Sequence, residues 1–373
     1  MKLKLKAMSF LLAAVLATAA SQSACASEYR IVDLGTLGGH ESKAWSVNEA
    51  GEIVGWALTP EAGIVERAAL WNNGPPAADL GTLGGATSRA FAINNDGWAV
   101  GQADTDGGLS HAFLWDGIDM TDLGTLGGDA SCAWDINDSL LVAGWAYNLD
   151  GFYHAVYWDG GPAQDLGTLG GDYSVAYGVN SSGAVVGVAK TVAGADRAVV
   201  WDDTGVHELG LLTGGSWSEA RDLNDHGQVI LYGDTTGGLT HAALWEDGLI
   251  TDLGTLGGEG SWAYGINNAG QVVGFAENED GFYRAFVYDG GEMHDLGTLG
   301  GWFSRAYGIN DCGWIVGKAQ AESGESHAVV WIPIPEPGAL LLLAVLGTLA
   351  LLVPRRWRAA SHQADPKTSV TTS

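Results

Sequence analysis

A segment that returns about every 43 residues dominates this chain. The heptapeptide Asp-Leu-Gly-Thr-Leu-Gly-Gly occurs six times, and a degraded copy begins at Glu208. The six intact copies begin at Asp33, Asp79, Asp122, Asp165, Asp252 and Asp295. A repeat of this length rules out most single-core folds, because each unit must bury its apolar face against its neighbours.

Each unit contains four short segments separated by turn residues. The first begins with Ser and ends with Asn six residues later in all seven units, and the second is β-branched, as in Val272-Val273-Gly274. The third begins with His or Arg and ends with Trp or Tyr four residues later, and the fourth leads into the heptapeptide. Segments of this length, rich in Val, Ile and aromatic residues, predict β-strands, and we expect no helix in the repeats.

The turn between the first two segments has the pattern Asn-x-x-Gly, as in Asn267 to Gly270. Asn at the start of a type I turn bonds the main chain ahead of it, and the Gly supplies the left-handed conformation that a hairpin needs. Only the third unit departs from this pattern, since Leu140 replaces the glycine.

Four antiparallel strands per unit of about 43 residues are typical of a β-propeller blade. The chain ends favour a closed ring, because residues 29–37 supply a lone fourth strand and residues 304–332 supply strands one to three of a seventh unit. The N-terminal strand would complete the last blade and cover its edge. We therefore expect residues 27–332 to form an all-β seven-bladed β-propeller, closed by the N-terminal strand, in preference to an open β-solenoid.

The N-terminus differs from the repeats. A start containing three lysines, an apolar run and the triplet Ala24-Cys25-Ala26 predict a signal peptide over residues 1–26. Export is therefore expected.

The C-terminus carries a second targeting pattern. Pro335, Glu336 and Pro337 precede an apolar stretch over residues 339–353, and Arg355 and Arg356 follow it. Residues 333–358 resemble the PEP-CTERM sorting signal. The resemblance implies an exosortase-type processing enzyme as partner and at least transient anchoring in the membrane through a C-terminal hydrophobic helix. A polar tail over residues 359–373 continues where that family usually ends, so cleavage and permanent anchoring both stay open.

The third segment of one unit, His111-Ala112-Phe113-Leu114-Trp115, is the namesake motif of the HAF-repeat family. Residues 29–332 resemble that family of extracellular repeat proteins. The resemblance implies a cell-surface or matrix location and brings no established activity.

Charge narrows the class of partner. Residues 27–334 contain 42 acidic and 10 basic side chains, so their net charge is −32. This negative charge disfavours binding to nucleic acid or to an anionic membrane surface. It is compatible with binding to divalent cations or neutral polymers.

The basic residue of the third segment is His in four units and Arg in three. Arg neither deprotonates nor ligates metals, so the position predicts a hydrogen-bond donor to the Asp of the same blade. The Ser and Trp of each unit suggest a blade-locking network similar to that of WD-type propellers. A hydrolase needs one catalytic triad, whereas this combination of Ser, a basic residue and an acid recurs in every unit. The combination therefore indicates a structural role.

Functional residues are expected where the units differ, in loops of one face that combine acids and aromatics. The candidate ligand-binding residues are Asp150, Tyr153, Asp280, Tyr283 and Trp302. Aromatic faces stack on sugar rings, and carboxylates bind hydroxyls or Ca²⁺. No other cofactor is expected. Asp104 and Asp106 are candidate Ca²⁺ ligands, although their loop lacks the distal Glu of a full calcium loop.

Together these patterns favour an exported, surface-associated, non-catalytic protein that binds extracellular polysaccharide or another surface component through this loop face. A purely structural matrix component and a polysaccharide-degrading propeller enzyme are the alternatives. A glycosidase needs two opposed carboxyls in different environments, and the even spread of acids singles out no such pair.

Overall fold

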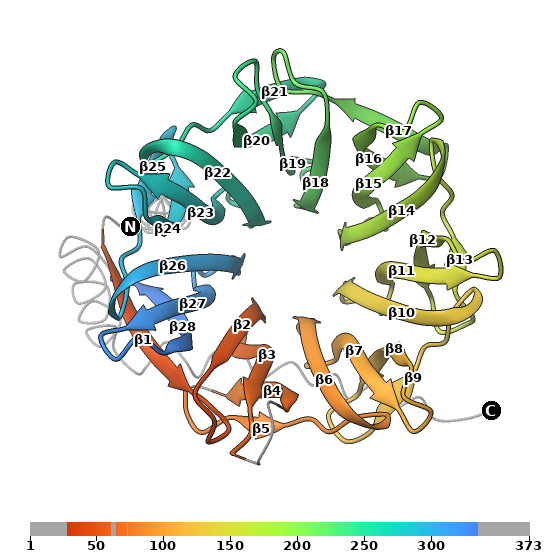
Figure 1. Cartoon of the computed structure of the whole chain (residues 1–373), viewed down its shortest axis with the longest axis horizontal. Helices are drawn as coiled ribbons and strands as arrows, with labels where there is room; N and C mark the ends of the chain where they lie inside the picture. Colours follow the sequence, from red (N-terminus) through yellow and green to blue (C-terminus); the bar gives the residue numbers. More distant parts are fainter. Residues whose placement is uncertain (1–27, 61–64, 73, 335–373) are drawn as a thin grey trace, which may run out of the picture. The chain divides into compact units, whose positions relative to one another are not determined.

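The computed structural model describes residues 28–60, 65–72 and 74–334. Within these ranges the chain forms seven four-stranded antiparallel sheets and no helix. Residues Tyr29–Pro333 form one unit in which the sheets follow one another around a central axis (Figure 1). The predicted all-β seven-bladed propeller is therefore confirmed.

Several predicted features lie outside the described residues. They are the signal peptide over residues 1–26, the sorting signal with Pro335, Glu336, Pro337, Arg355 and Arg356, and the polar tail over residues 359–373. Among the described residues, no helix has the length and apolar character needed to cross a bilayer.

The first three blades take their strands in chain order. Blade 1 contains β2 (Ser42–Val47), β3 (Glu52–Leu58), β4 (Glu66–Asn72) and β5 (Ala78–Asp79). Blade 2 contains β6 (Gly84–Ile93), β7 (Ala99–Thr105), β8 (Ser110–Trp115) and β9 (Met120–Asp122). Blade 3 contains β10 (Gly127–Ile136), β11 (Val142–Asn148), β12 (Tyr153–Trp158) and β13 (Gln164–Asp165).

The next three blades follow the same order. Blade 4 contains β14 (Gly170–Val179), β15 (Val185–Thr191), β16 (Asp196–Asp202) and β17 (Gly205–Gly210). Blade 5 contains β18 (Ser218–Leu223), β19 (Val229–Asp234), β20 (Thr240–Glu246) and β21 (Leu249–Asp252). Blade 6 contains β22 (Gly257–Ile266), β23 (Val272–Asn278), β24 (Tyr283–Asp289) and β25 (Glu292–Asp295).

Blade 7 joins the two ends of the propeller. It contains β26 (Gly300–Ile309), β27 (Ile315–Ala321), β28 (Ser326–Pro333) and, as its outermost strand, β1 (Tyr29–Gly35). Strand β1 pairs antiparallel with β28, so the N-terminal strand closes the ring as predicted.

The hydrophobic core lies between adjacent blades. Val100 of blade 2, for example, packs in one cluster with Val142 and Trp158 of blade 3. Trp158 is completely buried, and its indole nitrogen has no hydrogen-bond partner. This tryptophan therefore stabilises the propeller by apolar packing, and the predicted role of Trp in a polar network is wrong here.

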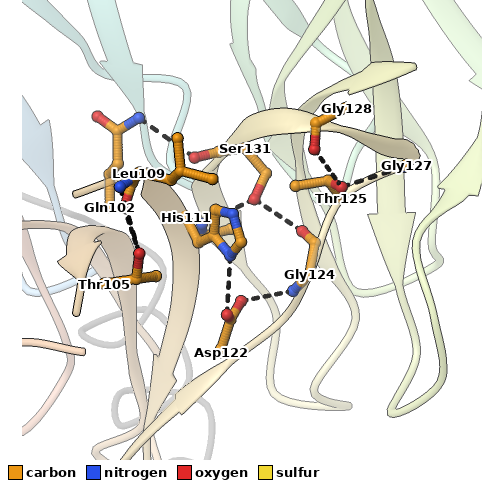
Figure 2. A network of polar contacts seen from close by, with 11 residues as sticks. Gln102, Thr105, Leu109, His111, Asp122, Gly124, Thr125, Gly127, Gly128 and Ser131 are labelled. Atoms are coloured by element: carbon orange, nitrogen blue, oxygen red, sulfur yellow. Dashed lines mark hydrogen bonds and ion pairs between the residues drawn. The ribbon is translucent and has the colours of Figure 1, made fainter. Parts of the chain in front are cut away.

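The expected contact between the basic residue and the acid is present in six blades; among the described residues, Arg284 of blade 6 makes no ion pair within 4.0 Å. In blade 2, His111 Nδ1 lies 2.8 Å from Asp122 Oδ2 (Figure 2). In blade 4, Arg197 makes the equivalent ion pair with Glu208 at 2.9 Å. The same His–Asp contact at 2.8 Å recurs in three pairs: His154–Asp165, His241–Asp252 and His327–Asp33.

The serine of each unit has a different task from the one predicted. Ser131 of blade 3 accepts a bond from the Ala112 N–H of blade 2 at 2.8 Å and donates to the Gly124 carbonyl at 2.7 Å (Figure 2). His111 Nε2 has no hydrogen-bond partner among the described residues. The serine thus joins neighbouring blades through main-chain atoms and takes no part in the His–Asp contact.

The seven turn asparagines form a closed ring. Within each turn, the Asn side chain accepts main-chain N–H groups as predicted; Asn267 accepts those of Ala269 and Gln271. Each Asn Nδ2 also donates to the carbonyl of the Asn in the next blade, in the order Asn48, Asn94, Asn137, Asn180, Asn224, Asn267, Asn310 and back to Asn48. This ring fixes the spacing of the innermost strands.

Candidate active site in the central channel

Every innermost strand contains a β-bulge three residues after its buried serine. In β6, Ala90 pairs with Gly101 and Ala92 with Val100, so Phe91 between them has no partner residue. A bulge redirects the extra side chain. The extra residue is Arg221 in blade 5 and aromatic in the other six blades: Trp45, Phe91, Trp134, Tyr177, Tyr264 and Tyr307.

Six of the seven bulges lie opposite a glycine of the second strand, and Leu231 takes this place in blade 5. A Cβ at Gly274 would lie 1.9 Å from the Trp262 carbonyl oxygen. In these six blades the glycine makes room for the main chain of the first strand.

These seven side chains surround a cavity of about 200 Å³ in the centre of the ring. The rings contact one another edge to face or tilted: the Trp45 and Tyr307 centroids are 4.5 Å apart, and those of Phe91 and Trp134 are 4.3 Å apart. Aromatic walls of this kind bind flat or sugar-like apolar faces.

Arg221 replaces an aromatic residue in this ring. Its guanidinium lies 3.8 Å from the Tyr177 ring centroid and 4.9 Å from that of Tyr264. The same group pairs with Glu219 at 2.9 Å, and Glu219 also accepts the Tyr232 hydroxyl at 3.0 Å. These contacts hold one cation in the wall of the cavity.

Two carboxyls, Asp135 of blade 3 and Asp222 of blade 5, line the same cavity. They follow the bulge at a position where the other blades carry Ser46, Ala92, Gly178, Gly265 and Gly308. Each carboxyl reaches the next blade: Asp135 Oδ2 accepts the Val179 N–H at 2.8 Å, and Asp222 Oδ2 accepts the Ile266 N–H at 3.0 Å. Their side chains are therefore fixed in orientation.

The two carboxyls lie on either side of Gly178 in blade 4. Asp135 bonds to Val179, the residue after this glycine. A Cβ on Gly178 would lie 3.2 Å from Asp222 Oδ1, so the missing side chain leaves room for that carboxyl. The sequence thus brings two acids from alternate blades to one main-chain segment.

Burial raises the pKa of both carboxyls above the usual aspartate value. The pKa of Asp222 is raised further, because the negative charge of Asp135 adds to the burial. The main-chain N–H bonds and Arg221 oppose this shift only in part. Two carboxyls whose environments separate their pKa values are suited to act as acid and base.

The predicted loop residues lie elsewhere. Tyr153 packs against Tyr173 at 5.1 Å and against Trp145 and Tyr147, while Asp150 is exposed in the β11–β12 loop.

Tyr283, Asp280 and Trp302 belong to blades 6 and 7. Tyr283 packs against Trp262 and Phe275 at 5.6 Å. Trp302 is 66% exposed and lies 5.2 Å from Phe282. Blades 3 and 6 are on different sides of the ring (Figure 1), so the Asp150–Tyr153 pair and the Asp280–Tyr283 pair do not form one site.

The candidate Ca²⁺ ligand Asp104 is engaged within the protein. Its Oδ2 accepts the Thr87 hydroxyl at 2.7 Å, and its Oδ1 accepts the Ser110 hydroxyl at 2.6 Å. Asp106 lies against Gly84, whose Cβ would clash with the Asp106 carboxyl. In the described parts of the chain, no group of three or more His, Cys, Asp or Glu side chains is arranged to hold a metal.

No protein-family model matches the sequence, and no curated protein matches it. Solved structures do. The β-propeller domain of the Trilobed protease from Pyrococcus furiosus is 10% identical, with a TM-score of 0.53 over 78% of this chain and 95% of that one. That domain is described as having an open velcro topology. In the present chain, β1 closes blade 7.

Two peptidases are similar as well. A puromycin-hydrolyzing peptidase from Mycobacterium tuberculosis is 14% identical, with a TM-score of 0.53 over 81% of this chain and 50% of that one. A puromycin hydrolase mutant is 14% identical, with a TM-score of 0.54 over 77% and 51%. The present chain therefore spans about half the length of these two peptidases. At such identities the likeness shows the propeller fold.

The comparisons correct the predicted function. The similar structures come from a protease and from peptidases, which fits the enzyme alternative better than a non-catalytic polysaccharide-binding surface protein. That prediction is therefore wrong. Within the protein, the carboxyls with raised pKa line the central channel, away from the loops on which the prediction relied.

Sequence reasoning missed Asp135, Asp222 and Arg221. A signal for them existed, because an acid or a cation at these positions interrupts a column of small or aromatic residues across the seven units. The bulge that turns this column toward the channel leaves no mark in the sequence of a single unit.

Proposed function

We propose that the chain is a polysaccharide-degrading enzyme, a glycoside hydrolase whose active site is the central channel. The observation that carries the proposal is the pair Asp135 and Asp222, placed on either side of Gly178 and surrounded by six aromatic side chains. Glycoside hydrolysis typically uses two carboxyls in different environments, and this pair meets that requirement.

The two acids have distinct roles in this proposal. Asp222, whose pKa is raised further, keeps its proton near neutral pH and gives it to the oxygen of the departing sugar as the glycosidic C–O bond breaks. Asp135 ionises first and takes a proton from the water that attacks the anomeric carbon. The products are two sugar chains, one with a new reducing end. The aromatic walls hold the sugar ring against the acids.

The test measures reducing ends released from a panel of neutral and acidic polysaccharides by the purified full chain. Asp222→Asn and Asp135→Asn keep the size of each side chain and remove its acid–base function. Each is expected to lower the rate by about 100-fold or more.

Asp159→Asn is the matched control, because Asp159 is an exposed acid in the β12–β13 turn; its activity should equal that of the wild type. Absence of cleavage across the panel, or full activity in Asp222→Asn, would refute the proposal.

We also propose that the enzyme is exported and sorted at the cell surface by an exosortase-type partner. The support is the signal-like segment 1–26 and the Pro335–Pro337 and Arg355–Arg356 pattern of the tail. N-terminal sequencing of the mature protein tests this, with Ser27 as the expected first residue. A mature protein that retains Met1, or one found in the cytoplasm, would contradict it.

A further inference from the structure

Basic side chains gather around the channel of this otherwise acidic protein. Residues 27–334 contain only 10 basic residues against 42 acidic ones. One of the ten, Lys43, interacts electrostatically with four others: Arg89, Arg221, Arg305 and Lys318.

Three of these cations share one place in adjacent blades. Lys43, Arg89 and Arg305 each follow the buried serine of the innermost strand, in β2, β6 and β26. These strands lie next to one another around the centre of the ring (Figure 1). Lys318 of β27 lies directly opposite Arg305 in the sheet of blade 7. These four basic residues therefore form an arc across blades 7, 1 and 2, and Lys43 places it against the cavity wall through Trp45 and Tyr307.

Two of the four basic residues in this arc have an acidic partner, and within the described ranges the other two, Lys43 and Arg305, have none. Arg89 pairs with Glu66, and Lys318 lies 3.7 Å from Glu41. Among the residues that the structure describes, no carboxylate lies within ion-pair distance of Lys43 or Arg305.

Both of these basic side chains lie against aromatic rings. The Lys43 ammonium is 3.6 Å from the Trp45 ring centroid and 3.9 Å from that of Tyr307, both in the cavity wall. The Arg305 guanidinium is 4.5 Å from the Phe275 centroid, and its buried Nε–H has no acceptor. A guanidinium with an unused donor beside an aromatic face is suited to a sugar that carries an anionic group.

The cations around Lys43 disfavour its protonated form. Burial, followed by the charges of Lys318, Arg305, Arg221 and Arg89, lowers the pKa of Lys43 from 10.5 to about 6. An anion bound beside Lys43 would oppose this shift and restore its proton.

We propose that this arc binds the acidic groups of the substrate, so that the enzyme acts on an anionic polysaccharide whose sugars carry carboxylate or sulfate groups. The inference rests on the proposed function and deepens it. The surface of the acidic chain repels such polymers, and the arc supplies a local group of basic side chains beside the aromatic wall of the cavity. A guanidinium donates two parallel bonds to a carboxylate or a sulfate, which a neutral sugar does not accept.

The test measures binding by calorimetry to full-length Asp222→Asn, which keeps the arc and removes the proposed acid. The probes are a hexamer of galacturonic acid, a sulfated galactan hexamer and a neutral glucan hexamer. An anionic hexamer is expected to bind at least roughly tenfold more tightly than the neutral one. The carboxylate and sulfate probes then distinguish the two sources of the anion.

Adding Arg305→Gln to the same chain should weaken anionic binding by roughly tenfold. Arg30→Gln is the matched control, since Arg30 is an exposed cation on the outer strand β1, and it should change nothing. Binding of the anion should also protonate Lys43. The protons taken up are measured at pH 7.5 from the difference between the binding enthalpies in two buffers, and a misfolded protein would not give this signal.

Equal binding of neutral and anionic hexamers, or unchanged binding in Arg305→Gln, would overturn this inference. The proposed function fails separately. Cleavage of neutral glycans alone would leave the hydrolase proposal standing without the anionic substrate. Tight anionic binding with no cleavage of any polysaccharide would leave the arc as a binding site and remove the hydrolase.

Discussion

Asn310 Nδ2 donates to the main-chain oxygen of Asn48 at 2.9 Å, across 262 residues of sequence. This bond joins blade 7 to blade 1 and completes the ring of seven asparagines. It acts together with the His327–Asp33 contact, which joins β28 to β1 at 2.8 Å. The propeller is therefore closed at two places, at the channel and at its outer edge.

Asn310→Ala should lower the free energy of unfolding by about 1–3 kcal/mol, because the buried Asn48 carbonyl loses one of its two donors and the Trp314 N–H loses its acceptor. Asn95 provides the control: its side chain also bonds the next blade, at Asp138, but it is exposed. Asn95→Ala should cost less than about 0.5 kcal/mol. Urea unfolding followed by tryptophan fluorescence measures both, and equal losses would contradict a special role for the buried ring.

Leu140 adopts a φ of 62° at the turn position where the other six units carry glycine. Its side chain packs against the core between blades 2 and 3, so removal has two opposing effects. Leu140→Ala loses the packing and keeps the left-handed strain, whereas Leu140→Gly relieves the strain. The Gly variant should therefore be more stable than the Ala variant by about 1 kcal/mol, the reverse of the usual order. Thermal unfolding of the two variants decides this, and a more stable Ala variant would refute it.

Lys43 makes the stability of the protein depend on pH. Its folded-state pKa of about 6 lies below its ordinary 10.5, so between these values the unfolded chain binds one more proton than the folded one. Stability should therefore rise with pH across this window and be lowest below pH 6.

The comparison variant is Lys43→Met, which lacks this proton. Relative to it, the wild type should gain stability steadily from pH 6 to pH 9. The difference between the two unfolding midpoints isolates Lys43 from Asp135 and Asp222, which both proteins share. If the difference between the two unfolding midpoints stays constant with pH, the pKa of Lys43 is not lowered in the folded protein.

The fold was predictable because each blade repeats the same local signals. Asn267 and Gly270 specify a turn by their own chemistry. Seven copies of such signals predict seven four-stranded blades, and a closed ring is the arrangement in which the lone N-terminal strand completes the last blade. The His111–Asp122 contact was predictable for the same reason, since His and Arg alternate at one position. Ser131 was misassigned because its partners are main-chain atoms of the neighbouring blade, which side-chain patterns do not reveal.

The candidate site was not predictable in the same way. Asp135 and Asp222 are 87 positions apart, and they become neighbours only because Gly178 of the intervening blade lacks a side chain. The β-bulge that turns Trp134 and Arg221 into the channel depends on pairing with the second strand. The loops attracted attention because they vary in length, whereas the informative variation was a change of residue type at a fixed position.

Gly178 offers the sharpest test of the carboxyl pair, because it touches Asp222 without itself carrying a reactive group. In Gly178→Ala the new Cβ would lie 3.1 Å from the Asp222 Cα and 3.2 Å from its Oδ1, so the carboxyl must shift by a few tenths of an ångström. Gly265→Ala is the matched control at the same position of blade 6, where the three atoms nearest to the Cβ would be the Gly308 Cα, the Tyr307 main-chain oxygen and the Val273 Cγ2, each at 3.2 Å.

Both substitutions should lower the unfolding midpoint by similar amounts, since both crowd neighbouring main chain. Only Gly178→Ala should lower kcat for polysaccharide cleavage, by roughly tenfold, because misplacing an acid by less than 1 Å already disturbs the geometry of proton transfer. Its pH–rate profile should also shift, since the distance between the two carboxyls sets how far their pKa values separate. Equal activity in the two variants would mean that Asp222 acts as a bond between blades and not as an acid.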